Sequence, residues 1–355
     1  MTSIRAVERD DLPQVASLFE RVLSPGSRTP AQERVEYFER TLLEHPWADP
    51  ELPSLVGVDG EGRIVGFIAT SVRRMRFDDR PVRVVGIGHL MADPDFRGRP
   101  VGALLMRAVF GGPQELTITD GANDASRRIW EGLGGHPSFL SCVVWTRPFR
   151  PWQFARDRLL RRRRGESDGR GAARPLWSAL DAATGRLPFF SAPPEPEGST
   201  EPLTPRALVE HLPSVADSLR LRPDYDEPFL DWLFAELREQ EPELVALLVR
   251  DKGGEAVGWF VYQLKRGGGS QVLQVAARDG AVDAVLDHLF HHAHANGAAA
   301  IQGRLEPRLL APLSKRRCVF HYSGEALIHS RHPEIVCAAL SGQALLTRLE
   351  GEWWE

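Results

Sequence analysis

The pattern of apolar and polar residues predicts a repeating order of short strands and amphipathic helices. In the first half, a strand at residues 4–7 precedes helices at 12–22 and 31–45, whose apolar residues recur at helical spacing. Two apolar segments then flank Asp59-Gly60-Glu61-Gly62, a sequence typical of a β-hairpin turn. The next elements alternate between strand and helix, and are predicted at residues 82–90, 103–110, 116–119, 125–133 and 139–146.

The second half repeats this order weakly, which indicates a tandem duplication. Residues 244–262 parallel the earlier hairpin, with Asp251-Lys252-Gly253-Gly254 at the turn, and one element at 319–328 completes the comparable order. Between the halves lie a basic run at 161–164 and a Pro/Glu-rich stretch at 191–202. We therefore predict an α/β protein with an N-terminal domain at residues 1–148, a basic and Pro-rich linker with short helices at 149–203, and a C-terminal domain at 204–355.

The composition is that of ordinary globular domains. The chain has 355 residues, of which 42% are hydrophobic and 26% charged, which is enough apolar material for two cores. A net charge of −4 provides no basic field for nucleic acid. Cys142, Cys318 and Cys337 are far apart and form neither a disulfide framework nor a zinc motif. Without a signal-peptide segment or an apolar run of membrane-spanning length, we expect a cytoplasmic protein.

One stretch of the first half predicts an anion-binding site. An apolar run ends at Asp93-Pro94, a loop rich in Arg and Gly follows, and a helical pattern begins directly after it. The first N–H groups of a helix lack intrahelical partners and the helix dipole places partial positive charge there. Arg97 and Arg99 add full charges. The site therefore suits a phosphate, and a pyrophosphate above all.

Two segments of the first half resemble the GNAT superfamily of acetyl-CoA-dependent N-acyltransferases. The loop Arg97-Gly98-Arg99-Pro100-Val101-Gly102-Ala103 resembles the family's cofactor motif, Arg/Gln-x-x-Gly-x-Gly/Ala, and the segment at 123–135 resembles the family's Asn-x-x-Ala-x-x-Leu-Tyr-Glu-Lys-Leu-Gly-Phe. The resemblance covers about residues 3–148. It implies two GNAT-like domains in tandem, each with a central, mostly antiparallel mixed sheet flanked by helices.

The resemblance also implies roles for individual residues. The backbone N–H groups of Arg99, Val101, Gly102 and Ala103 would cradle the CoA pyrophosphate, with Gly98 in the loop and Arg97 nearby. The pantetheine arm would pair with the backbone of Leu90, Met91 and Ala92, and would contact Asn123. The implied activity is transfer of an acetyl group, from acetyl-CoA or another acyl-CoA, to the amine of a small-molecule acceptor.

Three residues depart from the family pattern. Pro100 removes one N–H from the loop, Trp130 replaces the tyrosine that usually serves as the acid, and Gly88 occupies the position of a frequent glutamate base. His89 is the nearest replacement base, although strand alternation leaves open which side it faces and a structural, hydrogen-bonded histidine is the alternative. Asp93 and Asp120 either order the site or bind a cationic amine.

Other interpretations stay open. The second half passes through Arg278-Asp279-Gly280 straight into its helix without the glycine loop, so we expect it to bind CoA poorly and to close the substrate cleft or mediate pairing, which leaves a homodimer open. The missing proton carriers also fit a catalytically silent GNAT-fold CoA-binding or scaffold protein. A third interpretation is an acyl or aminoacyl transferase that does not use acetyl-CoA.

Two further features favour ordinary structural roles. His288 and His292 have the i, i+4 spacing of metal ligands, but no third ligand lies at a motif distance, so we predict a solvated helix face and no metal. The aromatic and Arg-rich segment at 149–164 is short and lies between domains, which favours a solvated connector helix over contact with an anionic membrane. Trp353 and Trp354 are predicted to pack on a domain or subunit surface.

Overall fold

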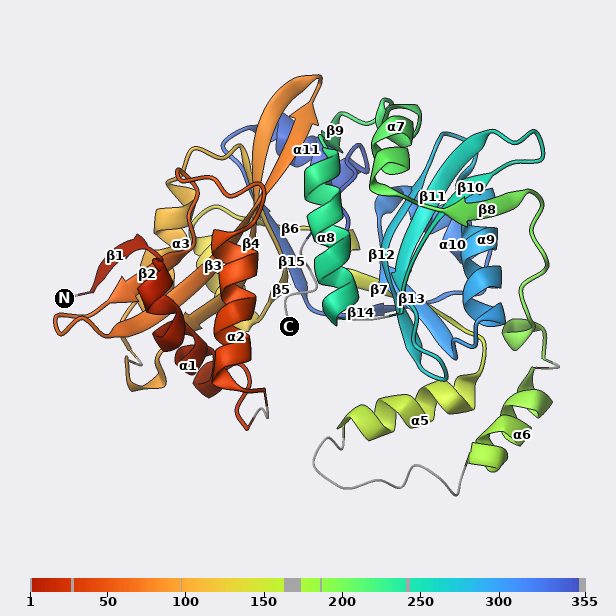
Figure 1. Cartoon of the computed structure of the whole chain (residues 1–355), viewed down its shortest axis with the longest axis horizontal. Helices are drawn as coiled ribbons and strands as arrows, with labels where there is room; N and C mark the ends of the chain where they lie inside the picture. The colour runs from red at the N-terminus through yellow and green to blue at the C-terminus, as the bar shows by residue number, and fades with distance from the viewer. Residues whose placement is uncertain are drawn as a thin grey trace.

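The computed structural model describes residues 2–26, 29–96, 98–162, 174–185, 187–240 and 243–350. It contains two mixed, mostly antiparallel sheets that are flanked by helices and lie side by side (Figure 1). This confirms the predicted fold class. Arg97, the last two arginines of the basic run and the Trp353-Trp354 pair lie outside the described residues. Within the described ranges, every helix is too short or too polar to span a lipid bilayer.

The first sheet is covered on both faces by the helices of the first half. Its strands, in spatial order, are β1 (Ser3–Ala6), β2 (Leu55–Val58), β3 (Ile64–Phe77), β4 (Arg80–Ala92), β5 (Leu116–Ala122), β15 (Glu325–His329) and β6 (His136–Pro137), with β9 (Leu221–Pro223) against the end of β3. Its helices are α1 (Leu12–Val22), α2 (Ala31–Phe38), α3 (Val101–Phe110) and α4 (Asp124–Gly132). One core lies under α1 and α2, and another under α3 and α4.

The second predicted helix is shorter than expected. It ends at Phe38, and a wide π-type turn, Glu39–Leu43, continues the chain. The hydroxyl of Thr41 donates to the carbonyl of Tyr37 at 2.8 Å. Because the wide turn buries both Thr41 and Leu42, this segment joins the core in a register that a regular helix pattern does not predict.

The second sheet has the same plan. Its strands are β8 (Ser199–Pro202), β10 (Leu244–Arg250), β11 (Ala256–Gln263), β12 (Gly269–Ala277), β13 (Ala300–Arg304), β7 (Val143–Pro148) and β14 (Val319–Tyr322). The remaining helices are α5 (Pro151–Arg162), α6 (Arg174–Thr184), α7 (Pro205–Ala216), α8 (Glu227–Gln240), α9 (Val282–Ala295), α10 (Leu310–Ser314) and α11 (Pro333–Ser341). In Figure 1, α5 and α6 stand apart below the second sheet.

The two halves exchange strands: β9 and β15 of the second half lie in the first sheet, and β7 of the first half lies in the second. β7, from the first half, pairs antiparallel with β13 and β14 of the second sheet. β15, from the second half, pairs antiparallel with β5 and β6 of the first sheet. The sequence predicts one continuous element at 319–328, whereas the structure divides it into β14 and β15, which lie in different sheets. The division of the chain at residues 148 and 204 stays a prediction, and each sheet is built across it.

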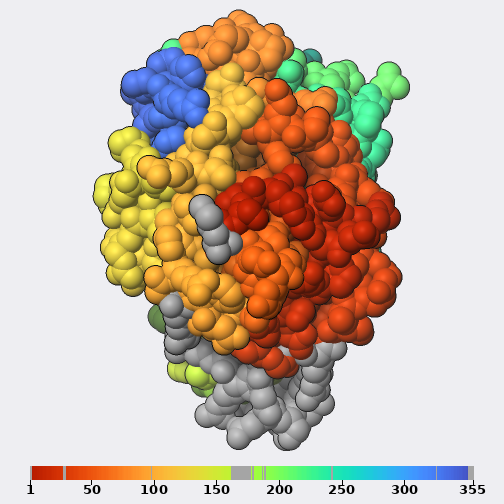
Figure 2. All heavy atoms as spheres, turned by 90° about the vertical axis from the view of Figure 1, so that its left-hand side faces the viewer, coloured from red at the N-terminus to blue at the C-terminus, as the bar shows by residue number. Residues whose placement is uncertain are grey.

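Contacts between the halves also involve helices. Trp47 of the first half stacks on Phe229 of α8 with 3.5 Å between ring centres, and its indole N–H donates to Asp226 at 2.9 Å. α11, drawn in blue, lies on the face of the first half (Figure 2), where Ile335 and Ala338 share a core with Leu116. The halves therefore bury apolar surface against each other in addition to exchanging strands.

The strand exchange predicts that the halves do not fold separately. Residues 1–203 expressed alone lose β15, so the edge of β5 and the surface that Leu327 and Ile328 bury become exposed. We expect this piece to show no cooperative thermal transition by circular dichroism, and the full chain to unfold in one transition. As a control, refolding it together with residues 204–355 should restore the transition. A cooperative melt of the isolated piece near the melting temperature of the full chain would contradict the prediction.

Candidate active site

The first sheet opens into a fork between its two parallel strands. β4 pairs with β5 only at Val84–Leu116, Val85–Thr117 and Gly86–Ile118, although β4 continues to Ala92 and β5 to Ala122. A cavity of about 220 Å³ lies where the strands have separated. We call it the fork cavity; its lining residues are Leu23, Ile87, Gly88, His89, Leu90, Met106, Thr119, Asp120, Gly121, Ala122, Asn123, Ser126 and Trp130.

Asp93 anchors the loop that leaves β4. Its side chain is fully buried, pairs with Arg63, lies 3.0 Å from Arg21, and accepts the N–H of Asp95 at 3.0 Å. Burial alone would raise the pKa of Asp93, but the Asp95 N–H and the two guanidinium groups outweigh it and hold the pKa below its usual range. With these partners, Asp93 orders the loop, the first of the two roles that the sequence leaves open.

The loop leads into α3 beside the fork. A Cβ built on Gly102 would lie 3.6 Å from Ile129 and 4.0 Å from Leu90, so the start of α3 packs between α4 and β4. Helix geometry leaves the N–H groups of Val101, Gly102 and Ala103 without partners inside the helix. The N–H of Arg99 instead donates to the carbonyl of Phe96 at 3.1 Å, and would have to leave this turn to reach a phosphate.

The last residues of β4 have one paired and one unpaired backbone edge. On one edge, Met91 and Ala92 pair with Phe67 and Gly66 of β3. The other edge has no strand partner beyond Gly86 among the described residues, because β5 has diverged, and it faces the fork cavity that Leu90 lines. Across the cavity, the side-chain oxygen of Asn123 caps α4 by accepting the N–H groups of Ala125 at 3.1 Å and Ser126 at 3.0 Å.

His89 lies on the side of the fork that faces α1 and α2. It has a positive φ of 46°, and its ring packs edge-on against Phe19 and Phe38, with 5.1 and 6.0 Å between ring centres. Burial lowers the pKa of His89 to about 4, and the positive charge of Arg34 acts in the same direction. The imidazole is therefore neutral at pH 7 but a weak base.

Trp130 forms a wall of the fork cavity. Its side chain is only 1% exposed and its ring meets Phe110 edge-on at 4.8 Å. An indole can donate a hydrogen bond there but cannot supply a proton near neutral pH. Trp130 therefore shapes the cavity and cannot take the role of the acid that the family's tyrosine usually has.

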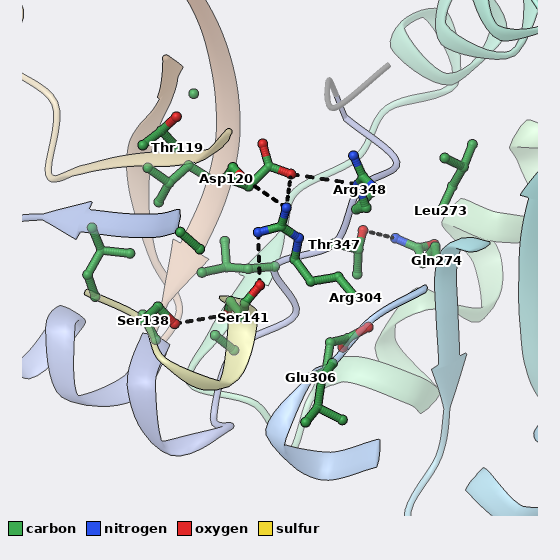
Figure 3. A pocket seen from close by; sticks show the side chains of 18 of the residues that line it. Thr119, Asp120, Ser138, Ser141, Leu273, Gln274, Arg304, Glu306, Thr347 and Arg348 are labelled. Carbon is green, nitrogen blue, oxygen red and sulfur yellow. Dashed lines mark hydrogen bonds and ion pairs between the residues drawn. The ribbon is translucent and has the colours of Figure 1, made fainter. Parts of the chain in front are cut away.

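A second cavity, of about 100 Å³, lies between the two sheets (Figure 3). We call it the inter-sheet cavity. The first sheet supplies Ser71, Arg73 and the residues at the fork, 86–88 of β4 and 118–120 of β5. The second sheet supplies residues 272–275 of β12 and residues 304–307. Thr347 and Arg348, from the C-terminal segment, close one side. The two cavities share four lining residues, Ile87, Gly88, Thr119 and Asp120.

Asp120 carries the charge at this junction. Its carboxylate lies 3.0 Å from Arg304 and 3.6 Å from Arg348. Dashed lines mark both ion pairs in Figure 3. Asp120 is two residues past the last β4–β5 pair, and Arg304 is two residues past Gln302, the last residue of β13 that pairs with β12. The ion pair therefore joins equivalent positions of the two halves.

Glu306 adds a buried carboxylate to the inter-sheet cavity. It lies 2.8 Å from Arg308, and both side chains are largely buried. Burial raises the pKa of Glu306, although the ion pair with Arg308 offsets part of the effect. Asp120 and Glu306 therefore place two carboxylates of different environment in one cavity.

The second half lacks an equivalent of the loop at α3. β12 reaches α9 through residues 278–281, and the N–H of Ala281 turns back to the carbonyl of Arg278. Its own fork, beyond Gln271 and Gln302, opens into the inter-sheet cavity. The second fork thus lines the inter-sheet cavity together with residues of the first fork.

The predicted solvated face of His288 and His292 is wrong. His288 is 6% exposed and bonds to the carbonyl of Glu197 at 3.0 Å, while His292 bonds to the hydroxyl of Tyr262 at 2.8 Å. The helical pattern alone did not reveal that the linker and β11 cover this face. Among the described residues, no three His, Cys, Asp or Glu side chains are grouped to hold a metal ion.

A family model and several solved structures are similar to this chain. Residues 15–134 match the model of the Acetyltransferase (GNAT) family. A GCN5-related N-acetyltransferase from Anabaena variabilis ATCC 29413 is similar with a TM-score of 0.58 and 11% identity over 95% of this chain and 74% of that one. One from Kribbella flavida gives 0.55 and 16% over 93% and 72%. The Saccharomyces cerevisiae N-myristoyltransferase with bound myristoyl-CoA gives 0.51 and 11% over 93% and 79%. No curated protein matched the sequence.

These identities establish likeness of fold, and the family match confirms the resemblance inferred from the loop and the 123–135 segment. Sequence reasoning singled out Asp120 but missed Ser71, Arg73, Arg304 and Glu306. A residue-by-residue alignment of the two repeats is the signal that would have found Arg304, because it stands opposite Asp120 in the repeat.

The burial of His89 predicts a pH-dependent stability. Unfolded, His89 binds a proton below about pH 6.5, whereas the folded protein keeps it neutral until about pH 4. The contribution of the neutral His89 to the free energy of unfolding is therefore complete above pH 6.5. As the pH falls toward 4, this free energy decreases by about 1 kcal/mol per pH unit. The His89→Asn variant, which does not titrate and tolerates a positive φ, should lose less stability over this range in urea unfolding. Equal slopes for both proteins would contradict the prediction.

Proposed function

We propose that this chain, which belongs to the acetyltransferase (GNAT) family through residues 15–134, is an N-acetyltransferase that acts on a small-molecule amine. The acyl donor, acetyl-CoA or another acyl-CoA, would occupy the fork cavity and the acceptor the inter-sheet cavity. One observation carries the proposal: the two cavities meet at Gly88 and Thr119, where β4 and β5 separate. Because the two cavities share lining residues there, a thioester in one cavity and an amine in the other would lie close to each other.

The residues of the first fork fit the proposed donor. The N-terminal N–H groups of α3 suit a pyrophosphate, and the free edge of β4 at Leu90, Met91 and Ala92 suits an extended arm with amide groups. Asn123 lines the same cavity. Bound there, an acyl-CoA supplies an activated acyl group. The bound myristoyl-CoA of the yeast N-myristoyltransferase, which has a similar fold, supports an acyl-CoA as the donor.

The transfer replaces the carbon–sulfur bond of the thioester by a carbon–nitrogen bond and moves one proton from nitrogen to sulfur. The amine nitrogen bonds to the acyl carbon, the carbon–sulfur bond breaks with its electron pair on sulfur, and the amine loses a proton while the thiolate gains one. N–H groups directed at the developing oxyanion lower the barrier. Asp120, at the junction of the cavities, is suited to hold the amine and to take its proton. His89 stays the base predicted from the sequence, although its ring packs against Phe19 and Phe38 on the side of the fork that faces α1 and α2.

A second candidate is a catalytically silent CoA-binding protein with the same fold. Pro100, Trp130 and the low pKa of His89 favour it, because they remove or weaken the usual proton carriers. This candidate shares the donor site and differs in having no turnover. A transferase that does not use acetyl-CoA would share the acceptor cavity instead.

Binding of the donor is tested by thermal denaturation with acetyl-CoA. A ligand that binds only the folded state stabilises it by about 2.7 kcal/mol at a hundredfold excess over Kd, so the melting temperature should rise. The Gly102→Asp variant places a carboxylate at the first turn of α3 and should lose this shift. Gly132→Asp, at an open position of α4, is the control that keeps it.

An absent shift in the parent protein would exclude both the acetyltransferase and the silent CoA-binding protein. A shift that persists in Gly102→Asp would place the donor elsewhere in the chain.

The proton acceptor is tested by comparing Asp120→Asn with His89→Asn. Loss of a general base costs typically 10²- to 10⁴-fold, so we expect Asp120→Asn to lower kcat by about 100-fold or more. CoA release from acetyl-CoA in the presence of a panel of amines is the measurement. Both variants should keep the acetyl-CoA thermal shift. If His89→Asn loses turnover and Asp120→Asn does not, the roles are reversed, and turnover retained by both would remove both from the mechanism.

A further inference from the structure

The inter-sheet cavity carries more positive than negative charge. Among the described residues that line it or pair with its lining, four arginines (Arg73, Arg304, Arg308 and Arg348) face three carboxylates (Asp120, Glu306 and Glu350). All seven side chains are partly or fully removed from water, and an uncompensated charge is costly in such a buried position. The cavity therefore favours a ligand that brings a negative charge of its own.

Two polar atoms on one wall point to the position of that charge. Ser71 and Arg73 lie on the same face of β3, are 6% and 5% exposed, and line the cavity. The Ser71 hydroxyl and the Arg73 Nε–H have no hydrogen-bond partner within the described chain. Buried polar groups are almost always paired, so two orphans side by side in a cavity wall indicate an absent acceptor atom.

The guanidinium of Arg73 is held in place by its other end. Its Nη1 donates to the carbonyl of Thr347 at 3.3 Å and lies 3.5 Å from Glu350. Glu350 in turn accepts from the buried hydroxyl of Tyr225. The Nε and Nη2 atoms of Arg73 lie against Gly86 of β4, 3.6 and 3.5 Å from the position that a Cβ on Gly86 would occupy. The absence of a side chain at Gly86 leaves the guanidinium edge open toward the cavity.

We infer that the acceptor is a small aminocarboxylate, whose carboxylate binds Ser71 and Arg73 over Gly86 and whose amine faces Asp120. This inference rests on the proposed function. Gly86 pairs with Ile118, and Asp120 is two residues further along β5. Strand rise and spacing put these backbone positions about 8 Å apart. Arg73, which lies over Gly86, and Asp120 both line the cavity. A ligand whose amine and carboxylate are separated by one to a few carbons can therefore bridge these two side chains.

The inference is tested with matched pairs of amines that differ only in the carboxylate. Phenylalanine with phenethylamine, and 4-aminobutyrate with propylamine, are incubated with the full chain and acetyl-CoA, and CoA release is measured. A hydrogen bond to a charged group is worth about a tenfold or larger factor. We expect kcat/KM to be higher by at least that factor for the member with the carboxylate in at least one pair.

Two variants test the position of the carboxylate site. Ser71→Ala removes a hydroxyl that has no partner, so it should raise KM for the aminocarboxylate about tenfold without lowering the melting temperature. Gly86→Ala adds a methyl that meets only ordinary contacts but covers the Arg73 edge, and should raise KM further. Ser214→Ala and Gly132→Ala, at exposed positions, are the controls and should match the parent.

Each outcome separates this inference from the proposed function. Equal use of both members of every pair, or unchanged KM in both variants, would overturn the inference while leaving the acyltransferase in place. An acetyl-CoA thermal shift with turnover of neither member of any pair, and no further shift by the aminocarboxylates, would overturn it as well. Failure of acetyl-CoA to shift the melting temperature at all would instead refute the proposed function.

Discussion

The short pairing between β4 and β5 is the constraint on which the site depends. After Gly86 and Ile118 the two parallel strands separate, while β5 keeps its backbone satisfied on its other side by pairing with β15. The gap places a free strand edge, a helix N-terminus and a cavity next to one another. A fully paired sheet would bury that edge and leave no gap between the strands at the residues that line both cavities.

The exchange of β7 and β15 determines how the duplicated halves are used. Because each sheet needs a strand from the other half, the two forks are fixed face to face across the inter-sheet cavity. Only the first fork has the long glycine-containing loop before its helix. The two halves therefore form one asymmetric site, in which the first half would hold the proposed acyl donor and the second half lines the opposite cavity.

The buried charges of the inter-sheet cavity are better explained by ligand recognition than by stability. Asp120 with Arg304, and Arg73 with Glu350, join segments that are far apart in the sequence. Buried ion pairs are often no more stable than apolar residues of the same size, because desolvation offsets their attraction. Such groups become useful where a charged ligand completes them, as we infer for the inter-sheet cavity.

The sequence by itself determined the local elements: the period of apolar residues predicted the strands and helices, and the loop with the 123–135 segment identified the family. Only the tertiary structure decided that residues 319–328 divide between two sheets, that His89 packs among Phe19 and Phe38, and that Arg73 approaches Gly86. The physical reason is range. A local pattern encodes whether a residue is buried, but strand partners and ion pairs join residues whose separation in the sequence carries no periodic signal.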